Sequence, residues 1–107
     1  MVNSDSEVIK LEMIEEAKGE FDLCKKIIGK INSNTAASVY YFNSLLHGYL
    51  EEWKEALTCI DESIDRSEDH YWRYFYLRGM LLACVHSFKE ATNDISVAIN
   101  LSGNTKP

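Results

Sequence analysis

The stretch from Tyr71 to Gly103, YWRYFYLRGMLLACVHSFKEATNDISVAINLSG, carries the pattern on which the fold prediction rests. Ser87 and Glu90 form an S-x-x-E capping box, which predicts that a helix begins directly after Ser87. From there, small and apolar residues recur every three or four positions, as on one face of a helix, at Phe88, Ala91, Ile95 and Ala98. Gly79, midway along the preceding apolar segment, has no side chain to hold a second helix away. The stretch therefore predicts two antiparallel helices in close contact.

The same pattern occurs a second time, 35 residues earlier in the chain. The corresponding pairs are Ser44 with Gly79, Trp53 with Phe88, Ala56 with Ala91, Ile60 with Ile95 and Ser63 with Ala98. A weaker third copy lies further upstream, where Phe21, Cys24 and Ile28 precede the second copy by 32 residues. Its preceding helix has a packing stripe of its own at Val8, Leu11 and Ile14. Self-similarity at a fixed period is typical of repeat proteins.

These copies predict six helices, near residues 5–18, 20–32, 36–50, 52–66, 70–85 and 88–101. We expect one domain over residues 1–107, divided into repeats at about 5–35, 36–69 and 70–103, with a polar tail at 104–107. A plain bundle of six helices is the alternative architecture.

The last unit resembles the tetratricopeptide repeat, a helix-turn-helix unit of about 34 residues. The resemblance depends on an early aromatic residue, a small residue in mid-helix and closely packed alanines, here Phe75, Gly79, Leu82, Phe88, Ala91 and Ala98. The chain departs from the family at Arg78, where leucine is usual, and at Gly103, where the unit normally ends in proline. The resemblance implies an all-α fold, a right-handed α-solenoid of three antiparallel helix pairs.

Composition agrees with a small helical domain and excludes several classes of protein. The chain has 107 residues, of which 46% are hydrophobic and 26% charged, with five glycines and one proline. So few turn-forming residues argue against a β-sandwich or barrel. A net charge of -6 opposes the phosphate neutralisation on which nucleic-acid binding depends, so we expect no nucleic-acid partner.

Apolar runs and cysteine spacing indicate the cellular compartment. The longest strictly apolar run, Met80 to Val85, is far shorter than a membrane span, so no membrane partner is expected. Residues 1–10 lack the pattern of a secretory signal. The three cysteines form no C-x-x-C pair, which favours reduced thiols in a cytoplasmic protein.

Residues capable of catalysis or metal binding do not converge in the sequence. His47, His70 and His86 lie in three separate segments, without the local spacing of metal ligands. Cys84 lies two residues before His86, a spacing that turns side chains apart on a helix. The five glycines are isolated, so no phosphate-binding loop is formed. We expect no enzyme activity, no cofactor and no metal.

The first helices of the repeats carry a second apolar face. In a repeat array these helices line an inner groove, and spacing places on it Ile9, Met13, Tyr41, Leu45, Tyr49, Arg73, Tyr76 and Met80. Such stripes are often core, but these helices already have a separate packing stripe, such as Phe75, Gly79 and Leu82. We therefore expect the groove residues to stay accessible and to contact a partner.

The sequence thus predicts a non-enzymatic adaptor or co-chaperone that binds a helix or extended peptide of a protein partner. Family members that bind chaperone tails carry a carboxylate clamp, but only Arg73 resembles a clamp residue, which argues against that role. The alternative is a chaperone of type III secretion that sheathes an aggregation-prone client, because small proteins with three such repeats and apolar grooves resemble that group.

The last helix pair predicts a second contact. Members of the family usually add a solvating helix after the final repeat, whereas this chain continues for six residues after Leu101. We expect this face to form a homodimer contact or to bind a client, with Val97 as the outward apolar residue.

Overall fold

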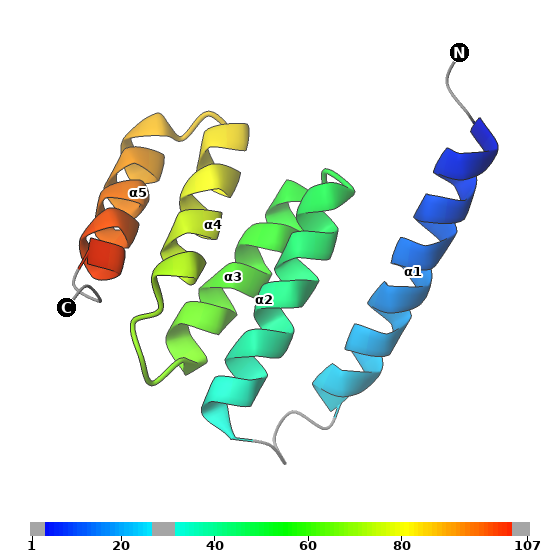
Figure 1. Cartoon of the computed structure of the whole chain (residues 1–107), viewed down its shortest axis with the longest axis horizontal. Coiled ribbons are helices and arrows are strands. Elements are labelled where there is room, and N and C mark those ends of the chain that lie inside the picture. The colour runs from blue at the N-terminus through cyan, green and yellow to red at the C-terminus, as the bar shows by residue number, and fades with distance from the viewer. Residues whose placement is uncertain (1–3, 27–31, 104–107) are drawn as a thin grey trace.

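The structure is a computed structural model that describes residues 4–26 and 32–103, and over these ranges it is all-α without strands. Five helices follow one another: α1 (Ser4–Lys26), α2 (Ser33–Tyr49), α3 (Trp53–Arg66), α4 (Trp72–Cys84) and α5 (Phe88–Gly103). Figure 1 shows them side by side in chain order and alternating in direction, with α1 at one end of the row and α5 at the other. The all-α class predicted from the sequence is confirmed.

One continuous helix replaces the first predicted helix pair. The expected break between residues 18 and 20 is wrong, because α1 runs through Gly19 without interruption. A single interior glycine costs a helix only about 1 kcal/mol relative to alanine, and the residues directly after Gly19, Glu20 and Phe21, are not N-cap residues. Phe21 and Cys24 belong to α1, but the packing roles predicted for their side chains, and for Ile28, lie outside what the structure describes.

The other four helices form two hairpins with the same turn. Between α2 and α3, Glu51 adopts φ 61°, and between α4 and α5 His86 adopts φ 64°. The Glu52 backbone N–H donates to the His47 carbonyl at 2.8 Å, and the Ser87 N–H donates to the Leu82 carbonyl at 2.9 Å. The positive φ and the backbone hydrogen bond each recur 35 positions later, so the predicted offset between the two units is confirmed by the backbone of their turns.

The two hairpins also share a point of close approach between their helices. In the first hairpin the buried Ser44 hydroxyl donates to the Ala56 carbonyl at 2.7 Å. In the second, a Cβ on Gly79 would lie 3.1 Å from the Ala91 carbonyl and 2.7 Å from Cδ1 of Ile95. The predicted close contact at Gly79 is therefore confirmed.

The core lies where α4 packs against the first hairpin. It consists of Ala37, Ala56, Ile60, Tyr74, Leu77 and Leu81, with Trp53, Leu57 and Ile64 partly buried against it. Two packing predictions are wrong. Phe88 is 60% exposed, because no described helix follows α5, and Val8 and Leu11 on α1 are 52% and 45% exposed although α1 lies beside α2.

Replacing Gly79 by alanine is expected to destabilise the protein by about 1–3 kcal/mol, because the new methyl group would force Ile95 and the α5 backbone away. Gly19→Ala is the matched control, since no atom lies within 4 Å of its Cβ position, and it should leave stability unchanged or raise it by up to about 1 kcal/mol. Urea unfolding followed by circular dichroism measures both. Equal stability of the two variants would contradict the close packing at Gly79.

Candidate functional site

Most of the predicted groove residues are exposed on α1, α2 and α4. Their exposed fractions run from 39% at Leu45 to 65% at Met13, with Ile9, Tyr49, Tyr76 and Met80 between these values. Arg73 is also exposed. Leu45 and Met80 stand at equivalent positions of the two hairpins, so they project from the same side of α2 and α4. These two helices are in contact, and we call the set formed by Leu45, Tyr49, Tyr76 and Met80 the α2–α4 face.

Tyr41 differs from the prediction that it is largely accessible. It is half-buried against the core, with its ring centroid 5.1 Å from that of Tyr74 and 5.4 Å from that of Phe42. Burial raises the pKa of the Tyr41 hydroxyl above its ordinary value. Tyr41, on α2, therefore packs against Tyr74 of α4 instead of being an exposed member of the α2–α4 face.

An aromatic cluster beside this face was missed by the sequence analysis. Trp72 lies with its ring centroid 6.2 Å from that of Tyr76, and the Arg73 guanidinium lies 5.3 Å from the Trp72 ring centre. Tyr71 packs edge-on against Tyr74 at 5.2 Å. The signal was present in the run YWRYFY at 71–76, because residues four apart, such as 72 and 76, lie on one side of a helix.

Helix α1, which carries Ile9 and Met13, is attached to the first hairpin in part through charged groups. Lys18 Nζ lies 2.9 Å from Glu52 Oε1, and the same oxygen lies 2.7 Å from His47 Nδ1. Lys10 Nζ lies 4.9 Å from the Tyr49 ring centre. The hydrogen bond from Lys18, and then that from His47, lowers the pKa of Glu52, and Glu52 in turn raises the pKa of Lys18.

We expect α1 to loosen in acid. Because folding lowers the pKa of Glu52, its contribution is complete above the ordinary value of 4.5 and is lost as the pH falls through the lower folded value. Amide exchange in α1, corrected for intrinsic rates, should therefore accelerate below pH 4.5 relative to exchange in α4. In Glu52→Gln this acid step should disappear and α1 should exchange faster already at neutral pH. An unchanged acid step in the variant would contradict the role of this ion pair.

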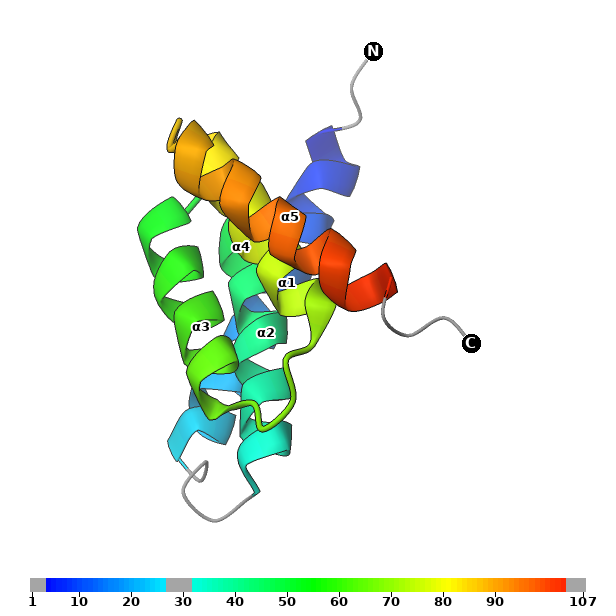
Figure 2. The same cartoon turned by 90° about the vertical axis from the view of Figure 1, so that its left-hand side faces the viewer.

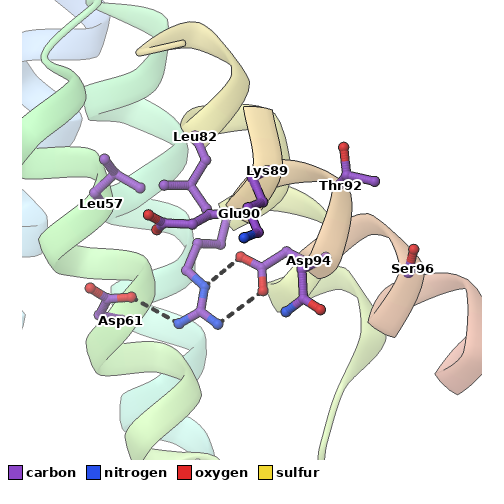
Figure 3. A pocket seen from close by; sticks show the side chains of 10 residues that line it. Leu57, Asp61, Leu82, Lys89, Glu90, Thr92, Asp94 and Ser96 are labelled. Atoms are coloured by element: carbon purple, nitrogen blue, oxygen red, sulfur yellow. Dashed lines mark hydrogen bonds and ion pairs between the residues drawn. The ribbon is translucent and has the colours of Figure 1, made fainter. Parts of the chain in front are cut away.

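A polar pocket of about 850 Å³ opens on another side of the molecule, among α3, α4 and α5 (Figure 3). Arg78 projects into it and donates from Nε and Nη2 to the two carboxylate oxygens of Asp94, at 2.7 and 3.0 Å. Arg78 Nη1 donates to Asp61 at 3.1 Å. These bonds raise the pKa of Arg78, the bonds to Asp94 most strongly. The guanidinium thus binds two carboxylates and connects α3, α4 and α5. This role accounts for an arginine at the position where leucine is usual in the tetratricopeptide pattern.

Loss of the Arg78 charge should be costly because it leaves the carboxylate of Asp94, only 4% exposed, without its partner. Arg78→Met is expected to lower the free energy of unfolding by about 3 kcal/mol, and Arg78→Met with Asp94→Leu should recover most of this loss. The control is Arg66→Met, which removes an exposed ion pair with Glu62 and should cost under about 1 kcal/mol. Chemical denaturation distinguishes the three. A double variant no more stable than Arg78→Met would contradict the assignment.

Neither a metal centre nor a membrane span emerges from residues 4–26 and 32–103. No cluster of three or more His, Cys, Asp or Glu side chains in these ranges is arranged to hold a metal ion. None of the described helices is long and apolar enough to cross a membrane. Comparison with protein-family models, curated proteins and solved structures found no match to this chain.

Proposed function

We propose that this chain is a non-enzymatic protein-interaction module whose α2–α4 face binds a helix or an extended peptide of a partner protein. The observation that carries the proposal is the repetition of exposed large apolar side chains at equivalent positions, Leu45 on α2 and Met80 on α4. Neither residue belongs to the core, which uses other sides of the same helices. An apolar face of this kind, separate from the core, is typical of a protein-binding surface.

Hairpins related by a 35-residue offset support a tetratricopeptide-like array, in which successive pairs stack with a right-handed twist. In such an array the first helix of each hairpin lines the inner surface, which is where α2 and α4 carry Leu45, Tyr49, Tyr76 and Met80. Aromatic residues suit this role because they bury a large area at a small cost in conformational entropy. Methionine suits it because its flexible side chain adapts to irregular partner surfaces. Helix α1 would add Ile9 and Met13 to the same surface.

A chaperone that sheathes an apolar client is the second candidate function. It is favoured by α1, on which Val8, Ile9, Leu11, Met13 and Leu23 are all exposed, on more than one side of the helix. A client that wraps around α1 would cover these residues together with the α2–α4 face. An adaptor would instead bind a soluble partner through the α2–α4 face alone.

The test starts from affinity purification of the tagged full chain, with mass spectrometry to identify the partner. Calorimetry with the purified partner should then show that Leu45→Ala with Tyr49→Ala weakens binding, by about 2 kcal/mol for each residue that is a true hot spot. Phe88→Ala serves as the matched control, because Phe88 is more exposed than Leu45 and Tyr49 but lies on α5. Wild-type affinity in the double variant, with unchanged helicity, would show that the α2–α4 face is not the binding surface.

A further inference from the structure

The first hairpin has an apolar socket that is filled by a side chain of the next helix. Cδ2 of Leu81, on α4, lies 3.3 Å from the position of a Cβ on Gly48. Leu81 is 3% exposed and belongs to the same core cluster as Ala56 and Ile60 on α3. Trp53 is partly buried beside them. The α2–α3 hairpin therefore receives a leucine from the helix that packs against it.

The second hairpin has a groove at the equivalent place. It has a volume of about 340 Å³, lies between α4 and α5, and is lined in part by Ala83, Phe88, Ala91 and Ile95. Thirty-five residues earlier, these positions are Gly48, Trp53, Ala56 and Ile60, the residues around Leu81. We call this groove the edge groove. It has the position and most of the apolar lining of the socket that Leu81 fills in the first hairpin.

Residues around the edge groove are exposed where their equivalents are covered. Phe88 is 60% exposed and Ile99 is 63% exposed, whereas Trp53 and Ile64 pack against the core. Figure 2 faces this end of the molecule, and no described helix lies in front of α5. The edge groove thus presents a helix-binding surface without a neighbouring helix.

We infer that the edge groove binds an amphipathic helix of a partner protein, placed on the second hairpin as α4 is placed on the first. Helix α4 shows the required chemistry, because Tyr74, Leu77 and Leu81 put an aromatic residue and two leucines at positions i, i+3 and i+7. The partner helix runs antiparallel to α5, as α4 does to α3 (Figure 1), and its last leucine enters the groove. This second surface goes beyond the proposed function, which concerns the α2–α4 face, although Met80 borders both surfaces.

A second copy of this chain is a poorer occupant than a partner helix. The equivalents of the three α4 residues are Val39, Phe42 and Leu46 on α2, so a second copy would have to offer that side of α2. Val39 and Leu46 on that side are already half-buried, and helix α1 lies beside α2 at that end of the row (Figure 1). A net charge of -6 on each copy also opposes association.

The probe is an 18-residue, fluorescein-labelled helical peptide of Ala, Glu and Lys that carries Tyr, Leu and Leu at i, i+3 and i+7. Its matched control replaces the last Leu by Ala. Fluorescence polarisation with the full chain should give saturable binding that the control peptide weakens at least tenfold. Phe88→Ala, which removes the exposed ring at the rim, and Ala83→Leu, which fills the groove, should each weaken binding about tenfold. Tyr49→Ala should leave the affinity unchanged.

Nuclear magnetic resonance locates the contact, because the amide signals of Ala83, Ala91 and Ile95 should shift when the peptide is added. Absence of saturable binding, or binding that Phe88→Ala leaves unchanged, would overturn the inference. A dimer of the wild-type chain that Phe88→Ala dissociates, seen by sedimentation, would also overturn it, since a second copy would then occupy the groove. The Leu45→Ala, Tyr49→Ala variant tests the α2–α4 face separately, so each proposal can fail without the other.

Discussion

The rest of the structure depends on the close approach of the two helices within each hairpin. At Ser44 the first hairpin brings a hydroxyl to the Ala56 carbonyl, and at Gly79 the second removes the side chain altogether. Both residues allow the two helix backbones to approach closely at equivalent positions. Ser44 adds a hydrogen bond there, whereas Gly79 has no side chain to keep the helices apart. Because the approach is the same, the surfaces that the hairpins present to their neighbours are equivalent too.

A second pair of equivalent positions shows how far the two hairpins diverge within one geometry. In the first, Asn43 donates to the Cys59 sulfur at 3.4 Å, and Asn43 Oδ1 is buried without a hydrogen-bond partner among the described residues. In the second, Arg78 and Asp94 form a two-bond ion pair that extends to Asp61 of the first hairpin. The ion pair joins the hairpins, whereas the amide–thiol contact holds only α2 to α3.

Two kinds of interaction attach neighbouring helices to the first hairpin, namely apolar packing and charged contacts. Helix α4 is held to the first hairpin by buried side chains such as Tyr74 and Leu81, whereas α1 is held in part by the Lys18–Glu52 pair at the turn after α2. Since Val8, Ile9, Leu11, Met13 and Leu23 on α1 are exposed, these side chains remain available to a partner. The apolar surface left open at the two ends of the row and on the α2–α4 face is the physical basis for both proposals.

The sequence by itself determined the helical class, the two hairpins, their 35-residue offset and the close contact at Gly79, because these follow from local spacing and residue size. It did not determine that α1 is one helix, since a single glycine is a weak signal for a break. Tyr41 and Tyr76 show the limit most clearly. They are the same residue at equivalent positions, yet one is half-buried and the other exposed. Only the tertiary structure decided this, because burial depends on whether a neighbouring helix follows.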